Sequence, residues 1–158
     1  MSQTAVITEF YSFLGEYSKF FEYMAKCEKE KLDAILQNKL SLLESSIATA
    51  QANAMQLTNM EKRRLTLQKN AGFEGKTFSQ LVDLAQVESK DDLRRCFALM
   101  EDDLGEIKYY NTKAMQLAES NLHLFGIATK ERTTEPFKKP MNQQNANDTA
   151  TPRLEIKA

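Results

Sequence analysis

The chain has 158 residues, a formal net charge of −1 and a pI near 5.9. This balance gives no overall basic field, so it argues against a nucleic-acid-binding protein or a membrane-surface module. All three Pro residues fall in the last 23 residues, which leaves the first 135 residues free of the strongest helix breaker. The apolar runs are too short for membrane insertion, and the N-terminal MSQTAVITEF lacks the features of a signal peptide. We therefore expect a cytoplasmic protein.

The first predicted helix covers about residues 4–36. Apolar residues recur at spacings of four and three from Ile7 to Met24, and a second line repeats every seventh residue from Val6 to Cys27. The apolar face is therefore wide and aromatic. Such faces are usually core, and the alternative is that part of this face receives a partner.

A break is predicted near residues 37–41. Ser41 and Glu44 fit a capping box, which predicts a second helix from there to about residue 70. One continuous helix with a kink stays open as an alternative, because the segment contains no Gly or Pro. The apolar stripe of the second helix, expected to face its neighbours, runs through Leu43, Ile47, Ala50, Ala54 and Leu57. Residues 45–54 are mostly small, and we expect them to receive the Phe-rich face of the first helix.

Local signals then predict a loop, a short helix and a last long helix. Gly72 is placed to take the left-handed conformation that ends a helix. Thr77 and Gln80 form a second capping box, which predicts a short helix that acts as a lid or corner. Ser89, followed by Asp91 and Asp92, is the predicted N-cap of the last helix.

The last helix is expected to organise the fold. Between residues 93 and 125 the four-three spacing is unbroken: Leu93, Phe97, Met100, Leu104, Ile107, Asn111, Ala114, Ala118, Asn121 and Phe125. A helix of this length spans roughly 50 Å and cannot be stable alone with one apolar stripe. We predict an all-α fold: an elongated antiparallel helical bundle or coiled coil of three long helices and one short helix over residues 1–128. Residues 129–158 are predicted to be a disordered polar tail.

The end of this helix carries the candidate binding residues. Asn111 and Asn121 would fix register or partner choice if they are buried, and the alternative is that they turn to the edge and meet water. Apolar residues lie beside them on more than one face of the helix, which suggests surface reserved for another chain. The predicted partner-binding residues are Ala114, Met115, Leu117, Leu122, Phe125 and Ile127.

Sites for chemistry are not recognisable. His123 follows Glu119 by four residues, which is not the Glu-x-x-His pattern of di-metal bundles. Cys27 and Cys96 are expected to be reduced thiols, and a disulfide between them requires the first and last helices to pair at that height. No phosphate-binding loop or nucleophile–base pair is visible. We therefore expect no metal, no cofactor, no catalytic residues and no enzyme activity.

The residues that connect these elements resemble a known family. The run Glu61-Lys-Arg-Arg64-Leu65 leads into Asn70-Ala-Gly72-Phe73, and after a short helix the last helix ends in Ala118-Glu-Ser-Asn121-Leu122. Over residues 5–127 this pattern is similar to FlgN-type flagellar export chaperones. The resemblance implies a non-enzymatic cytoplasmic chaperone that binds amphipathic terminal helices of hook–filament junction proteins and delivers them to the flagellar type III export gate. The alternatives are a homo-oligomeric structural coiled coil, or an export chaperone for flagellin or the filament cap.

Overall fold

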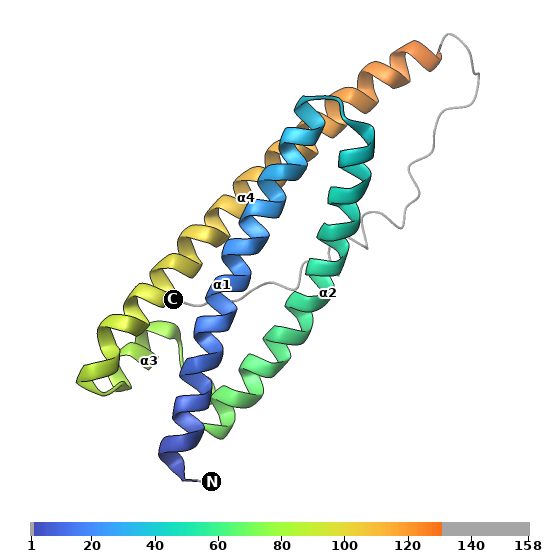
Figure 1. The fold of residues 1–158 in the computed structure, drawn as a ribbon. Helices are drawn as coiled ribbons and strands as arrows, with labels where there is room; N and C mark the ends of the chain where they lie inside the picture. Colours follow the sequence, from blue (N-terminus) through green and yellow to red (C-terminus); the bar gives the residue numbers. More distant parts are fainter. Residues whose placement is uncertain (1, 131–158) are drawn as a thin grey trace.

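The computed structural model describes residues 2–130, and every element in this range is a helix. The helices are α1 (Gln3–Leu36), α2 (Leu40–Asn70), α3 (Phe78–Leu84) and α4 (Val87–Lys130) (Figure 1). The predicted three long helices and one short helix are therefore confirmed. The predicted disordered tail lies outside the described residues, except that α4 continues two residues past the predicted boundary at residue 128.

α1 is the central helix, because both α2 and α4 pack along it while α2 and α4 do not pack on each other within residues 2–130. α2 runs antiparallel to α1, whereas α4 runs in the same direction as α1 (Figure 1). The thiol of Cys96, near the start of α4, lies 3.4 Å from the backbone oxygen of Leu14, near the start of α1. The predicted antiparallel contact therefore holds for α1 and α2, while the α1–α4 contact is parallel.

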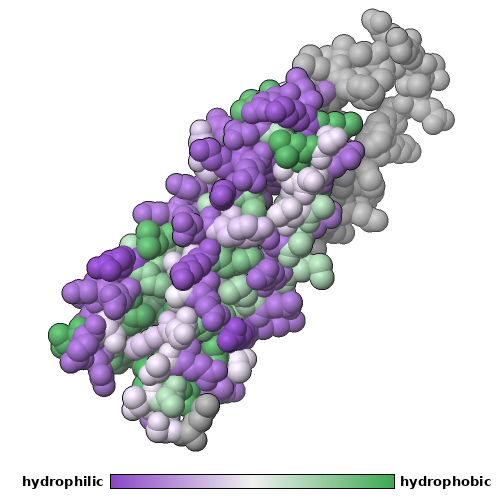
Figure 2. All heavy atoms as spheres, viewed as in Figure 1, coloured by the Kyte–Doolittle hydropathy of each residue, from purple (hydrophilic) through white to green (hydrophobic). Residues whose placement is uncertain are grey.

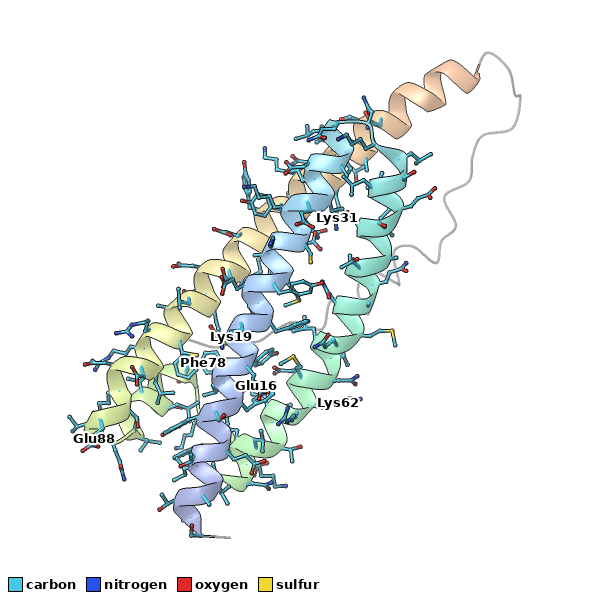
Figure 3. All side chains as sticks on the ribbon, viewed as in Figure 1. Glu16, Lys19, Lys31, Lys62, Phe78 and Glu88 are labelled. Carbon is cyan, nitrogen blue, oxygen red and sulfur yellow. The ribbon has the colours of Figure 1, made fainter. Side chains whose placement is uncertain are left out.

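The core is aromatic and lies at the α3 end of the bundle. Its largest fully buried side chains are Tyr17, Phe10, Phe13, Phe21, Leu14, Leu81 and Met100. The ring of Phe78 on α3 stacks on that of Phe97 on α4, with centroids 4.1 Å apart and planes 5° from parallel. α3 therefore closes this end as the predicted corner or lid, and Phe78 and Glu88 mark it in Figure 3.

The small residues of α2 do not receive the Phe-rich part of α1. Antiparallel pairing instead places that part of α1 opposite the second half of α2. The guanidinium of Arg63 lies 4.8 Å from the centroid of the Phe13 ring, and the hydroxyl of Tyr17 donates to Glu61 at 2.7 Å. The predicted pairing was wrong because the direction of the chain, and not the complementarity of size, decides which halves meet.

The corner between α1 and α2 is a true break, so one continuous kinked helix is excluded. Asn38 takes the left-handed conformation, with φ of 53°. The amide of Lys39 donates to the oxygen of Ala34 at 3.1 Å, and that of Asn38 donates to Ile35 at 3.2 Å. These two bonds form a Schellman motif, in which Asn replaces the usual Gly. The predicted capping box at Ser41 does not start α2, because the helix already begins at Leu40 after Lys39, without a side-chain cap.

The other helix ends follow their local signals with one exception. Gly72 takes a left-handed φ of 86°, and Thr77 and Gln80 form the predicted reciprocal capping box. The predicted N-cap at Ser89 was wrong, because α4 begins at Val87 and the amide of Ser89 already donates to the oxygen of Gln86.

A chain of polar side chains crosses the core and ties three elements together. Glu61 accepts from Tyr17 and, through both of its oxygens, from Arg64 at 2.9 and 2.6 Å. Arg64 also donates to the side-chain oxygen of Gln68 at 2.6 Å. The amide of Gln68 then donates to the oxygens of Phe73 and Lys76, both at 2.9 Å. Burial, reinforced by Glu61, raises the pKa of Tyr17, so the phenol stays protonated and remains a donor.

Removing one member of this network should destabilise the fold. Arg64→Ala leaves the Glu61 carboxylate without its cation in a largely buried position, so we expect a loss of about 3 kcal/mol in the free energy of unfolding. Urea denaturation at pH 7 measures it. The neighbouring Arg63 has a side chain that is 55 % exposed, so Arg63→Ala should cost less than about 1 kcal/mol. Equal losses for the two variants would contradict this account.

The corner gives a second prediction. Asn38→Gly should leave stability unchanged or raise it, because Gly takes a positive φ without strain. Asn38→Ala should lower the free energy of unfolding by about 1 kcal/mol, because its Cβ disfavours the left-handed conformation. Thermal unfolding followed by circular dichroism compares the two. An Ala variant as stable as the Gly variant would show that the corner does not hold Asn38 in this conformation.

Candidate partner-binding surface

The half of the bundle away from α3 buries fewer side chains and exposes more large apolar residues. Beyond Lys31, which Figure 3 labels, α1 ends at the corner with α2. Few side chains in this half are buried: Met24, Ala25, Leu32, Ala34, Asn53 and Ala114. Large apolar residues are instead open to solvent at its end, with Leu36 59 % and Leu40 69 % exposed at the corner. This half therefore has apolar residues available to a partner.

The predicted partner-binding residues divide into three groups. Ala114 is buried against the bundle, whereas Met115 is 49 % exposed and Leu117 is half-buried. The structure thus leaves Met115 and part of Leu117 open and places Ala114 inside. Leu122, Phe125 and Ile127 belong to the helical backbone of α4, and their side chains lie outside the described residues.

Asn111 and Asn121 both have exposed side chains, as in the alternative in which these residues meet water. The side-chain nitrogen of Asn111 lies 3.9 Å from the sulfur of Met115. Asn121 closes a cavity of about 160 Å³ at the α1–α2 corner, together with Ala34, Ile35, Asn38, Lys39, Leu40 and Leu43. α4 therefore passes the α1–α2 corner at Asn121.

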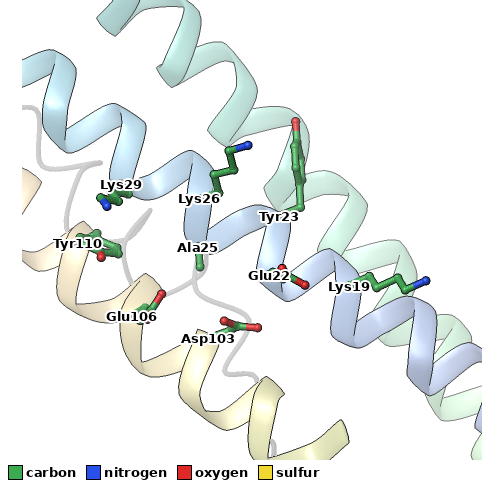
Figure 4. Close-up of a pocket in the computed structure, with 9 residues that line it drawn as sticks. All are labelled: Lys19, Glu22, Tyr23, Ala25, Lys26, Lys29, Asp103, Glu106 and Tyr110. Atoms are coloured by element: carbon green, nitrogen blue, oxygen red, sulfur yellow. The ribbon is translucent and has the colours of Figure 1, made fainter.

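A larger groove, of about 510 Å³, lies between α1 and α4 and is strongly charged (Figure 4). Six of its nine lining residues are charged: Lys19, Glu22, Lys26, Lys29, Asp103 and Glu106. Burial raises the pKa of Asp103, and the nearby Glu106, Glu22 and Asp102 raise it further. Lysines and carboxylates alternate here, which is typical of a solvated face, and the view in Figure 2 likewise shows mainly hydrophilic side chains with separate apolar patches.

Two kinds of site named in the sequence analysis, a metal cluster and a disulfide, can be checked in the described residues. Residues 2–130 contain no group of three or more His, Cys, Asp or Glu side chains able to hold a metal ion. Cys27 and Cys96 are both free. Because α1 and α4 are parallel and Cys96 lies beside Leu14, the two thiols are about 13 residues, or roughly 20 Å, apart along the bundle. In the same range, no helix combines the length and the apolar character needed to cross a bilayer.

Sequence reasoning missed part of the exposed apolar surface. Ile47 was expected inside, on the stripe of α2 that faces its neighbours, but it is 44 % exposed. Asn53 is buried instead, at 8 % exposure. The signal that could have found this surface is the absence of any charged residue from residues 45–60, which is unusual for a helix with an open face.

Comparison of the chain with protein-family models, with curated proteins and with solved structures finds no match.

The charged groove predicts a pH-dependent effect. A carboxyl whose pKa is raised by folding opposes folding when it ionises, so its penalty is absent below its unfolded pKa and grows as the pH rises through the folded value. Asp103→Asn should therefore stabilise the protein at pH 7 and have no effect at pH 3. The gain should stay below about 1 kcal/mol, because the side chain is still partly exposed to water. Urea unfolding at both pH values measures it, and an equal gain at pH 3 would refute the electrostatic cause.

Proposed function

We propose that this protein is a cytoplasmic export chaperone of the FlgN type. In this role it covers amphipathic terminal helices of hook–filament junction proteins, prevents their premature assembly and delivers them to the flagellar type III export gate. The observation that carries the proposal is that α4 continues past the α1–α2 corner, which Asn121 adjoins, to Lys130 (Figure 1). Neither arm of the hairpin extends as far.

The projecting end of α4 has a physical reason to bind another helix. Residues 122–127 read Leu-His-Leu-Phe-Gly-Ile, so this segment brings four large apolar residues to a part of the helix beyond the hairpin. A helical segment this short is marginally stable in water by itself. A partner helix that covers it stabilises both, and it does so through a few apolar anchors.

The chemistry of the surface suits a client that must later be released. Met115 is exposed on the same helix, and methionine adapts its shape to different partners. No covalent or metal-mediated step is required to hold an apolar stripe. Binding that depends on a few anchors can be reversed when the export gate competes for the client.

Two other functions remain as alternatives within this proposal. A structural coiled coil would pair the projecting end of α4 with a second copy of itself, and its mass in solution would then rise with concentration. An export chaperone for flagellin or the filament cap would use the same surface for a different client. The first experiment below separates these alternatives.

Calorimetric titration of the full chain with C-terminal helical segments of hook–filament junction proteins tests the function. We expect dissociation constants of micromolar or tighter, with no binding to the corresponding flagellin segment. Binding to the flagellin segment alone keeps the class of chaperone and changes the client. No binding to either, together with a self-assembled oligomer by light scattering, would replace the chaperone by the structural coiled coil.

A double substitution tests the projecting end. Leu122→Asp with Phe125→Asp should weaken client binding by at least about 100-fold, because anchors of an interface are worth roughly 2 kcal/mol or more each. Helicity should stay near that of the natural chain. A matched control is Leu84→Asp with Val87→Asp, since these residues are 54 % and 80 % exposed at the opposite end. Unchanged binding by the first variant, or equal loss in both, would contradict the placement of the site.

A further inference from the structure

α3 shows what kind of segment fits between α2 and α4. These two long helices do not pack on each other within the described residues, and α3 packs on α4 at one end and reaches α2 through its Phe78 side chain. The Phe78 ring of α3 stacks on the Phe97 ring of α4, with the ring centroids 4.1 Å apart. The guanidinium of Arg64 on α2 lies 5.7 Å from the centroid of the same Phe78 ring. Leu81 and Val82 of the same short helix are buried in the core. An amphipathic helix is thus the natural occupant of this side of the bundle.

The surface that holds α3 continues along both helices after α3 ends. Glu101 of α4 lines a cavity together with Val82 of α3, so its side of α4 faces α3. Met115 follows Glu101 by two heptads and therefore lies on the same side, farther along. On α2, Gln68 binds the loop that leads to α3, and Ala54 and Ile47 follow it at two and three heptads towards the corner.

Burial decreases along this surface in a regular way. Leu57 and Leu104 are partly buried and pack against the aromatic core. Farther from α3, Ile47 is 44 % and Met115 is 49 % exposed. The apolar stripe that begins in the core therefore becomes exposed where no other helix of residues 2–130 covers it.

On α2, charge separates this surface from the opposite groove. Residues 45–60 of α2 contain no charged side chain, whereas six of the nine residues lining the α1–α4 groove are charged. On α1, Lys31 follows Tyr17 by two heptads, and its ammonium lies 2.6 Å from the carboxylate of Glu28. These charges are matched within the chain, so a helix lying above them needs no buried charge of its own.

We propose that the client helix lies along this surface, between α2 and α4. It would continue the position of α3 towards the corner, so that α3 covers the core and the client helix covers the surface beyond α3. We call it the distal face; its residues are Ile47, Ala54, Leu57, Leu104, Asn111 and Met115. This assignment rests on the proposed chaperone function and adds the path of the client. The client helix then forms the fourth member of a bundle with α1, α2 and α4, and the projecting end of α4 extends the same contact.

The length of the distal face defines the partner. From Leu104 to Asn121, where α4 reaches the corner, the surface spans 17 residues, or roughly 26 Å. It therefore accommodates an amphipathic helix of about five turns. The charged residues of the partner belong on its outer side, away from residues 45–60.

Paired substitutions on the same two helices test the path. Ile47→Asp and Met115→Asp place a charge on the distal face, and each should weaken binding of the junction-protein segment at least tenfold. Met55→Asp and Leu99→Asp are the matched controls, because these residues are 72 % and 52 % exposed but lie elsewhere on α2 and α4; they should bind within twofold of the natural chain. Circular dichroism verifies that all four variants fold.

Hydrogen exchange on the natural chain gives a readout that needs no substitution. Adding the junction-protein segment should protect amides in residues 40–57 of α2 and 104–118 of α4. Protection confined to residues 122–130, with full binding by the Ile47 and Met115 variants, would overturn the path and leave the chaperone function standing. Absence of binding by the natural chain would overturn both.

Discussion

The whole structure depends on one helix having two partners at once. α2 and α4 both pack along α1 and do not meet within the described residues, so nearly all tertiary contact between the long helices passes through α1. A helix in this position needs an apolar face much wider than a coiled-coil stripe. The aromatic residues of its first half, from Phe10 to Phe21, supply that width. Beyond Met24, where these aromatic residues end, the bundle buries few large side chains.

The polar network from Tyr17 to Gln68 fixes the position of α2 along the axis of α1, which apolar packing alone cannot do. Contacts among apolar side chains are non-directional, and the small residues of α2 would fit α1 at several heights. The hydrogen bond from Tyr17 to Glu61 can form in only one alignment of α2 along α1. Arg64 and Gln68 extend the constraint to the loop before α3. A buried ionic network contributes little net stability by itself, but a wrong pairing would leave its charges unmatched.

Local signals in the sequence predicted the helices well, and non-local features were harder to predict. The four-three spacing gave the three long helices, and Gly72 and Thr77 marked their loop because turn chemistry depends on neighbouring residues alone. Asn38 was overlooked, since only Gly and Pro were considered as breaks. Ile47 was assigned to the interior because a stripe of small residues fits two registers one residue apart, and only tertiary contact chooses between them. For the same reason, the sequence grouped Ala114 with Met115, although adjacent residues leave a helix in directions about 100° apart.

The parallel contact between α1 and α4 has a consequence for synthesis of the protein. Leu14 and Cys96 touch although 82 residues separate them. A nascent chain can form the α1–α2 hairpin as soon as α2 leaves the ribosome, but the aromatic face of α1 stays incompletely covered until α3 and the first turns of α4 have been translated. During that interval the nascent protein exposes an apolar helix of the kind that we propose it covers in its clients. The exposure ends only when translation of α3 and the first turns of α4 is complete.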